Sequence, residues 1–353
     1  METQGELQRM TYPDGHEGWL ATGRSAVRAV LSDDRFSVRP DLMHNPWVDT
    51  GGQKPPPPAP GLFGDMDAPD HTRYRRLLTG QFTVRRMRLL EDRIREITAD
   101  HLDAMERNGP TADLITAFAQ PIPALTICEL LGVPYEDRGG FQDDIVAVTG
   151  SMVDYDALME ALARQQAYIG ELVVRKRAEP QDDLISGLTE SDLTDEEIAN
   201  MSLFLLGGGL DTTTNVFATG LLELLREPER VERLRTEPEV VVEEILRAVS
   251  IIPMTARSAL ADVEIDGRLV RAGETVALSI EDANKDLSGG HVSFGHGIHQ
   301  CIGQQLARVE LKVGFPALFD RFPKLRLAVA ESELPWRPHA LVRGILELPI
   351  AWD

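Results

Sequence analysis

The feature that most constrains this chain is a helical pattern that continues almost without a break from about residue 71 to 250. Apolar side chains recur there every three or four residues, as on one face of an α-helix. Within it, LTDEEI carries the Thr-x-x-Glu signature of a capped start and predicts a long helix from near Asp195. Short strand-like runs flank the region on both sides. We expect a mainly α protein with small β-sheets, forming one domain over residues 1–353 because no linker or repeat divides it.

Composition excludes several classes of protein. The 57 acidic residues outnumber the 36 basic ones, and a formal net charge of −21 argues against nucleic acid as a partner. Two cysteines, Cys128 and Cys301, cannot build a disulfide framework and favour a reducing compartment. No apolar run approaches the roughly 20 residues that span a bilayer, and from the polar start we expect no signal peptide. We expect a cytoplasmic protein without a membrane segment.

The most unusual stretch, SFGHGIHQCIGQQLAR, surrounds Cys301 at residues 293–308. Helical spacing resumes directly after the cysteine, so Cys301 is expected at or just before a helix N-terminus. Free N–H groups and the helix dipole would stabilise a negative sulfur there. His299, two residues upstream, is placed to bond an anionic group beside a metal. Nearby glycines permit positive φ and close approach to a flat ligand: Gly295, Gly297 and Gly303.

Three interpretations of Cys301 stay open on these residues alone. The first is a buried structural cysteine. The second is a zinc site shared with histidines, although the crowded spacing lacks the separated ligand pairs of tetrahedral zinc sites; its candidate ligands are His291, His296, His299 and Cys301. The third is a haem iron, which needs one strong axial ligand and leaves the opposite face free.

A second unusual stretch, LLGGGLDTTTN, lies inside the long capped helix at residues 205–215. Each glycine there costs roughly 1 kcal/mol of helix stability relative to alanine. Thr212 is predicted to bond back to the carbonyl of Gly208, which would bend and open the helix and leave room for a ligand. Asp211 and Thr212 would form a proton-transfer pair. The alternative is a groove of small residues that packs against another helix.

Two weaker signals complete the set. Glu244 and Arg247 stand three residues apart on one helix face, a common spacing for solvated pairs. Eight arginines fall between residues 73 and 95 of this acidic chain, which indicates either an anionic ligand or acidic partner, or a solvated helix face.

Together, these features resemble the cytochrome P450 family of haem-thiolate monooxygenases. FGHGIHQCIG matches the family pattern Phe-x-x-Gly-x-His/Arg-x-Cys-x-Gly at every fixed position, GGLDTT matches its oxygen-activation motif, and EEILR matches its Glu-x-x-Arg motif. DAPDHTRYRRLL resembles the stretch with which soluble bacterial members bind the haem propionates. The resemblance extends from about residue 15 to the end and is most similar to actinobacterial members that tailor secondary metabolites.

The resemblance implies roles for individual residues. Haem b would lie between the long distal helix and the cysteine-loop helix, with Cys301 as the iron ligand and Asp211 and Thr212 donating protons during oxygen activation. Glu244 and Arg247 would lock the core beneath the haem. Further cofactor contacts would come from His71, Arg75, Gly208, Arg257, Phe294, His299 and Gly303. Substrate contacts would come from Leu206, Leu210, Ile252, Met254 and Leu341.

The implied activity is hydroxylation or epoxidation of a small organic substrate with O2, in secondary metabolism. Electrons would come from a separate ferredoxin and ferredoxin reductase, because the chain has no flavin or iron–sulfur module. Two alternatives are oxidative C–C or C–N coupling and a non-catalytic haem or small-molecule binding protein. The N-terminus and the connection at 286–291 look shorter than in the family, which carries in that connection an arginine that completes a triad with the Glu-x-x-Arg pair.

Overall fold

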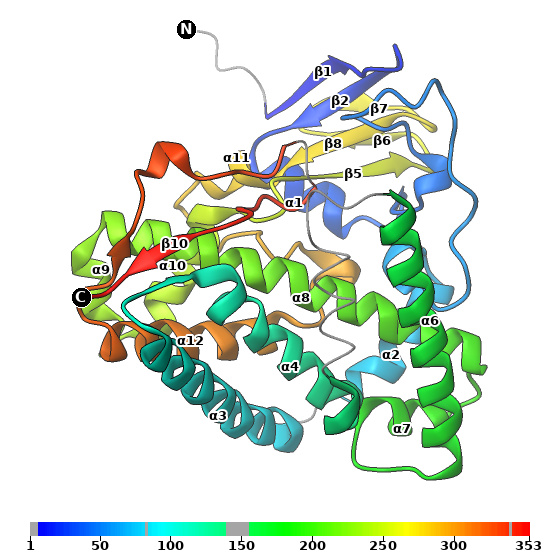
Figure 1. The fold of residues 1–353 in the computed structure, drawn as a ribbon. Helices are drawn as coiled ribbons and strands as arrows, with labels where there is room; N and C mark the ends of the chain where they lie inside the picture. Colours follow the sequence, from blue (N-terminus) through cyan, green and yellow to red (C-terminus); the bar gives the residue numbers. More distant parts are fainter. Residues whose placement is uncertain (1–5, 82–83, 139–154, 339–340) are drawn as a thin grey trace, which may run out of the picture. The chain divides into compact units, whose positions relative to one another are not determined.

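The computed structural model describes residues 6–81, 84–138, 155–338 and 341–353 (Figure 1). The chain divides into two compact units. The first comprises Met1–Arg76 and Ile252–Ile302, and the second comprises Leu77–Ile251 and Gly303–Asp353. Each unit is assembled from two separate stretches, so no single cut in the chain separates them. This agrees with the absence of a linker in the sequence.

The first unit is built on a five-stranded sheet in the order β1-β2-β8-β5-β3 (Figure 1). β2 pairs antiparallel with β1 and parallel with β8, and β5 pairs antiparallel with β8 and β3. A separate hairpin is formed by β6 and β7. The strands are β1 (Leu7–Thr11), β2 (Glu17–Ala21), β3 (Phe36–Ser37), β5 (Met254–Ala259), β6 (Val263–Ile265), β7 (Arg268–Val270) and β8 (Thr275–Ser279). The strands predicted on either side of the helical region are confirmed.

One face of this sheet forms the core of the first unit. Helix α1 (Arg24–Ser32) is amphipathic and buries Val27 and Val30 among strand residues such as Trp19 and Leu278. The unit also contains α11 (Ile280–Asn284) and single turns, among them η1 (Pro40–Leu42) and η2 (Phe63–Asp65). Helix α2 (Asp70–Thr79) begins in the first unit and ends in the second.

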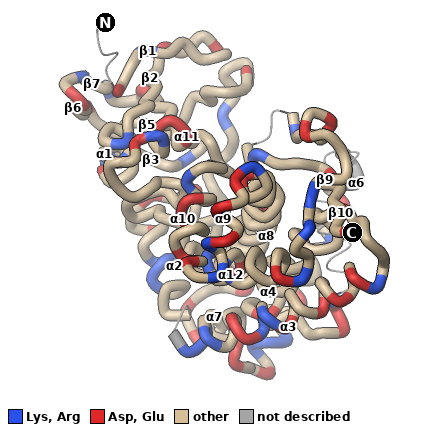
Figure 2. The backbone as a smooth tube through the Cα atoms, turned by 90° about the vertical axis from the view of Figure 1, so that its left-hand side faces the viewer, with Lys and Arg blue, Asp and Glu red and all other residues tan. Residues whose placement is uncertain are grey.

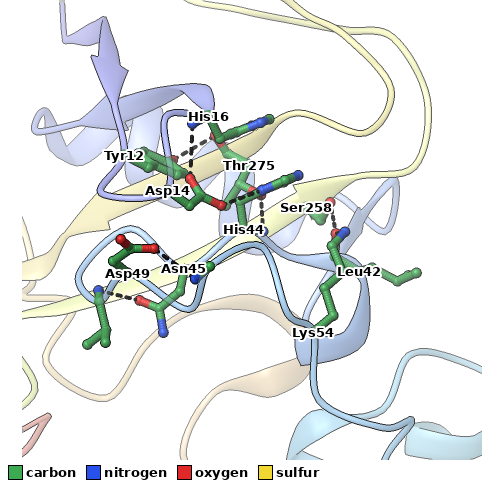
Figure 3. A network of polar contacts seen from close by, with 12 residues as sticks. Tyr12, Asp14, His16, Leu42, His44, Asn45, Asp49, Lys54, Ser258 and Thr275 are labelled. Atoms are coloured by element: carbon green, nitrogen blue, oxygen red, sulfur yellow. Dashed lines mark hydrogen bonds and ion pairs between the residues drawn. The ribbon is translucent and has the colours of Figure 1, made fainter.

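The proline-rich loop between η1 and η2 is attached to the sheet by a polar network (Figure 3). His44 contacts Asp14 through Nδ1 at 2.8 Å, and its backbone N–H donates to Thr275 Oγ1 at 3.0 Å. The rings of His16 and His44 stack with centroids 3.8 Å apart. The bonds from His44 and from the backbone of His16 hold the pKa of Asp14 below its usual range. The loop is therefore fixed to the β1–β2 turn and to β8.

The second unit is helical, with α8 packed against α4, α6, α7, α10 and α12. A small sheet in the order β4-β10-β9 accompanies the helices. The helical elements are α3 (Val84–Asn108), the π-helical turn η3 (Ile115–Ala119), α4 (Pro121–Leu131), η4 (Tyr135–Asp137), α6 (Tyr155–Ala178), α7 (Leu184–Thr189), α8 (Asp195–Arg226), α9 (Pro228–Arg233), α10 (Pro238–Val249), α12 (Gln304–Arg321) and η6 (Glu331–Glu333). The strands are β4 (Thr111–Asp113), β9 (Arg326–Leu327) and β10 (Pro349–Ala351).

The predicted start of α8 is confirmed. Thr194 Oγ1 accepts the Glu197 N–H at 3.2 Å, and Glu197 Oε2 accepts the Thr194 N–H at 2.7 Å, which completes the capping box. The helical pattern that follows α8 is divided into α9 and α10. Pro238 accounts for the division, because proline lacks the N–H that a continuing helix needs and is favoured in a first turn. Among the described residues, every helix is too short or too polar to cross a bilayer.

Candidate functional site

The segment around Cys301 is a tight loop of the first unit. The Cys301 N–H donates to the carbonyl of Phe294 at 2.8 Å, and Gly295 and Gly297 adopt φ of 70° and 74°. A Cβ on Gly297 would lie 2.3 Å from the carbonyl oxygen of Leu31, so only glycine fits there. The left-handed conformations expected at these two glycines are confirmed.

The loop leads directly into a helix, as predicted. Cys301 is exposed and stands three residues before Gln304, the first residue of α12. The positive φ expected at Gly303 is wrong, because this residue caps α12 with φ of −82°. The exposure of Cys301 argues against the interpretation as a buried structural cysteine.

Four predicted cofactor ligands gather in this unit. His71 and Arg75 extend from α2, Arg257 from β5, and His299 from the turn η5 (Gly297–His299). The rings of His71 and His299 have centroids 4.0 Å apart, and the Arg75 guanidinium donates to the carbonyl of Gln300. Residues from three distant parts of the sequence therefore form one cationic cluster next to the cysteine loop.

The electrostatics of the cluster indicate an excess of positive charge. Burial, and then the charges of His71, Arg257 and Arg75, lower the pKa of His299 to about 3. Burial and the neighbouring Arg75 also lower the pKa of His71. Burial lowers the pKa of Arg257 to about 10, although Asp67 and Asp65 act in the opposite direction. An anion in the cluster would relieve all three effects.

The residues present fit a ligand with carboxylates. Both ring nitrogens of His71 are buried and have no hydrogen-bond partner among the described residues. Arg257, also buried, makes no ion pair within that part of the chain and donates to the Ala256 carbonyl at 2.7 Å. No three His, Cys, Asp or Glu side chains gather as metal ligands in the described ranges, which argues against the zinc interpretation. Two propionates would give His71 a hydrogen-bond partner and Arg257 an ion-pair partner.

Helix α8 carries the second motif in the other unit. Thr212 Oγ1 donates to the Gly208 carbonyl at 2.7 Å, as predicted, but α8 continues through the motif as a regular helix, so the expected opening is not observed. A Cβ on Gly208 would meet no atom within 4 Å, which leaves space beside the backbone. Leu206 and Leu210 are each 3% exposed in the core. The substrate contacts expected of them stay a prediction.

Asp211 has partners that the sequence analysis missed. Arg337 Nη1 lies 2.8 and 2.9 Å from the two carboxylate oxygens of Asp211. Asn215 Nδ2 donates to Oδ1 of Asp211 at 3.0 Å and to its carbonyl at 2.8 Å. The contact with Asn215 could have been predicted, because Asp211 and Asn215 are four residues apart on one helix. Arg337, 126 residues away, carries no signal of its own.

The carboxylate of Glu244 is bound by arginines of α9. Arg233 donates to its two oxygens at 2.9 and 3.2 Å, and Arg230 lies at 3.5 Å. Arg247 is half-buried on the same helix as Glu244. The sequence pattern indicated this helix face but missed the contribution of α9.

The remaining expected substrate residues differ in exposure. Ile252 and Met254 are half-buried in the first unit, and Trp47 Nε1 contacts the sulfur of Met254 at 3.4 Å. Trp47 is a neighbour that the sequence analysis did not find. Leu341 is 64% exposed in the second unit.

The arginine-dense segment is partly neutralised. Acidic and basic residues alternate along α3 (Figure 2), and four of its arginines form ion pairs with carboxylates: Arg85 and Arg86 with Asp182, Arg93 with Glu96 and Glu129, and Arg95 with Glu91. This part of the segment is therefore a solvated helix face, one of the two alternatives that the sequence left open. Arg76 and Arg88 are exposed.

The short connection after α11 is closed by its own hydrogen bonds. Asn284 accepts the Val292 N–H at 2.7 Å and donates to Ser293 Oγ at 2.8 Å. Arg24 of α1 donates to Asp286 at 3.0 Å and to Ser288 at 2.9 Å. The chain therefore passes from α11 to the cysteine loop through an ordered turn.

Comparisons with known proteins agree with the motifs. The family profile described as Cytochrome P450 matches residues 154–242 and 281–327. Cytochrome P450 105C1 of a Streptomyces species is 43% identical, covering 98% of this chain and 92% of the relative. Mycinamicin IV hydroxylase/epoxidase of Micromonospora griseorubida is 38% identical, covering 99% and 94%. The crystal structure of a CYP105P1 mutant superposes with a TM-score of 0.93 at 37% identity, covering 99% and 94%.

The alignment lengths also bear on the short connection. The alignment with cytochrome P450 105C1 has 366 positions, whereas this chain has 353 residues. At least 13 positions of that alignment are therefore gaps in this chain. A shortened connection between α11 and the cysteine loop is consistent with such gaps.

Proposed function

The chain belongs to the cytochrome P450 family of monooxygenases, and we propose that its first unit binds haem b with Cys301 as the thiolate ligand of the iron. The observation that carries the proposal is the cationic cluster beside the exposed cysteine, in which the buried ring nitrogens of His71 have no hydrogen-bond partner among the described residues. Such a cluster requires anions, and haem brings two carboxylates together with a metal that accepts one thiolate.

Four side chains would hold the propionates by charge-assisted hydrogen bonds: His71, Arg75, Arg257 and His299. Phe294 and the two left-handed glycines would shape the loop around the sulfur, since the Phe294 carbonyl fixes the Cys301 backbone. When bound, a thiolate-ligated haem activates dioxygen so that one oxygen atom enters an organic substrate. The chain itself must then supply protons and exclude stray water.

Proton supply is assigned to α8. Asp211 would take a proton from solvent at its carboxylate, and the Thr212 hydroxyl would pass a proton onward. Thr212 Oγ1 already donates to the Gly208 carbonyl, so its oxygen lone pairs stay available to accept a proton from a neighbouring donor. A Cβ on Gly208 would meet no atom within 4 Å, so this turn of α8 has open space beside its backbone.

The substrate is proposed to be a small organic metabolite that becomes hydroxylated or epoxidised. Support comes from relatives of secondary metabolism, among them the mycinamicin IV hydroxylase/epoxidase. Met254, Ile252 and Trp47 offer apolar surface in the first unit, and Leu341 does so in the second.

Replacement of Cys301 by serine tests the haem-thiolate assignment. The purified, haem-loaded protein is reduced and exposed to carbon monoxide, and thiolate ligation moves the Soret band to long wavelength. We expect this band in the wild type and in the Cys128→Ser control, and its loss in Cys301→Ser. A Cys301→Ser protein that kept both the band and the oxidising activity would overturn the proposal.

Electrons are proposed to come from a ferredoxin and its reductase, with the exposed Arg76 as part of the docking surface. Arg76→Glu is expected to slow reduction by an acidic ferredoxin several-fold at low salt and less at high salt, because ions screen exposed charges. Arg107→Glu makes the same charge change near the C-terminal end of α3 and is the control. Equal rates for Arg76→Glu and wild type at low salt would contradict this docking surface.

A further inference from the structure

The ion pair between Asp211 and Arg337 joins two parts of the second unit that are far apart in sequence. One nitrogen, Arg337 Nη1, contacts both oxygens of the carboxylate, and the side chains of Arg337 and Asp211 are only 13% and 22% exposed. Solvent therefore competes little for either partner, and the pair is worth more than one on the open surface.

Arg337 lies in a C-terminal hairpin whose described arms are residues 335–338 and 341–346. Its own N–H donates to the Gly344 carbonyl at 2.9 Å, and the Leu346 N–H donates to the Pro335 carbonyl at 2.9 Å. Trp336 and Ile345 form a β-bridge between the two sides. The backbone at Arg337 is thus fixed independently of its ion pair.

The hairpin also contacts α8 through Asn215. The buried amide of Asn215 binds Asp211 through Nδ2 and accepts the Ile345 N–H through Oδ1 at 3.3 Å. A Cβ on Gly344 would lie 2.2 Å from that Oδ1, so the hairpin fits closely against the amide. Asp211 is therefore held from two sides by the same hairpin, directly by Arg337 and indirectly by Asn215.

We propose that Arg337 is a positioning residue for Asp211, and that the two described arms of the hairpin set the orientation of the carboxylate that passes protons. The inference rests on the proposed function of Asp211. Oδ1 accepts hydrogen bonds from Arg337 and Asn215, whereas Oδ2 accepts one from Arg337. Oδ2 keeps the greater lone-pair capacity, so it is the atom that takes up and releases the proton.

The orientation matters because proton transfer depends steeply on geometry. Without Arg337, Asn215 would be the only side-chain partner of Asp211 among the described residues. The carboxylate could then rotate about its side-chain torsions and hydrate. A displacement of about 1 Å at a reacting group can cost about a hundredfold in rate.

The test compares two ways of driving the enzyme with 7-ethoxycoumarin as a fluorogenic probe. One uses NADPH, ferredoxin and reductase, which depends on proton delivery from the protein. The other uses hydrogen peroxide, which brings its own two protons with the oxygen–oxygen bond. The ratio of the two rates isolates proton delivery from folding and probe binding.

We expect this ratio to fall about tenfold or more in Asp211→Asn and in Arg337→Met. Arg337→Lys should fall between Arg337→Met and wild type, since it keeps the positive charge but carries it on a flexible stem that fixes the carboxylate less firmly. The double variant should be no lower than Asp211→Asn. Arg326→Met, which breaks the exposed Arg326–Asp353 pair, is the matched control and should keep the wild-type ratio.

A second readout uses the haem-free protein. If Arg337 acts through Asp211, the decreases in melting temperature of the two single variants should not add in the double variant. Three outcomes would overturn the inference without affecting the proton role of Asp211. They are additive decreases in melting temperature, a wild-type rate ratio for Arg337→Met, and equal losses of the NADPH-driven and peroxide-driven rates in that variant. A wild-type ratio for Asp211→Asn would overturn its proton role, and the assignment of Arg337 with it.

Discussion

The cysteine loop and the central turn of α8 carry the two main motifs of this chain in opposite electrostatic states. Around Cys301, buried His71 and Arg257 lack acceptors or ion-pair partners among the described residues, and two glycines hold left-handed conformations. On α8, the backbone is a regular helix and the charge of Asp211 is balanced by Arg337. The first region presents buried cationic side chains that an anion would stabilise, whereas in the second region the charge is paired within the protein. Their responses to mutation, pH and haem should differ accordingly.

The largest effect is expected from Gly297→Ala in the cysteine loop. Alanine at φ of 74° is strained, and its Cβ would lie 2.3 Å from the Leu31 carbonyl, so we expect a loss of roughly 3 kcal/mol or more in the free energy of unfolding. Gly295→Ala is the control, because φ is 70° there but no atom lies closer than 4.0 Å. It should cost about 1 kcal/mol. Urea unfolding measures both, and equal losses would show that the contact with α1 contributes nothing.

The next effect is a loss of stability in acid caused by His299. The unfolded chain binds a proton at this ring below about pH 6.5, whereas in the folded protein its pKa is lowered to about 3. Stability is therefore lost as the pH falls below 6.5, by roughly 2 kcal/mol between pH 6.5 and 4.5 in the haem-free protein.

Urea unfolding at the two pH values checks this effect of His299. His299→Asn should reduce the loss, and His101→Asn on α3 should not. Haem should also reduce it, since propionates would favour the protonated ring. The same acid loss in loaded and haem-free protein would contradict the comparison between the two regions.

Glu310 of α12 contacts Thr213 of α8, and burial rather than an ion pair keeps its carboxyl group neutral. Burial raises its pKa to about 8, and hydrogen bonding with Thr213 opposes this only in part. The stability it contributes is present at low pH and is lost as the pH rises from 4.5 to 8, by roughly 2 kcal/mol between pH 6 and 8. Glu310→Gln should flatten that decline in thermal unfolding, whereas Glu171→Gln on the exposed face of α6 should leave it in place. An unchanged decline in Glu310→Gln would show that another group titrates.

The sequence made the cysteine loop easier to predict than the surroundings of α8. Cys301, Gly295 and Gly297 lie within seven residues, so their spacing alone encodes the loop. His71 and Arg257 were placed by resemblance, and their convergence follows from the fold. Arg337 was missed because an ion pair across 126 residues leaves no local pattern. Helical spacing placed Leu206 and Leu210 on one face of α8 without showing which face is buried, and their contact with substrate stays a prediction.

The smallest effect is expected from Gly344→Ala, which tests whether the α8 region is as complete as the comparison implies. The new Cβ would lie 2.2 Å from Asn215 Oδ1, and the buried amide would have to shift, at a cost of about 1–2 kcal/mol. Because Asn215 also binds Asp211, the ratio of NADPH-driven to peroxide-driven turnover should fall as well. Gly290→Ala in the short connection of the first unit is the control, since its Cβ would meet nothing within 4 Å. A stability loss with an unchanged ratio would mean that the hairpin supports the fold without orienting Asp211.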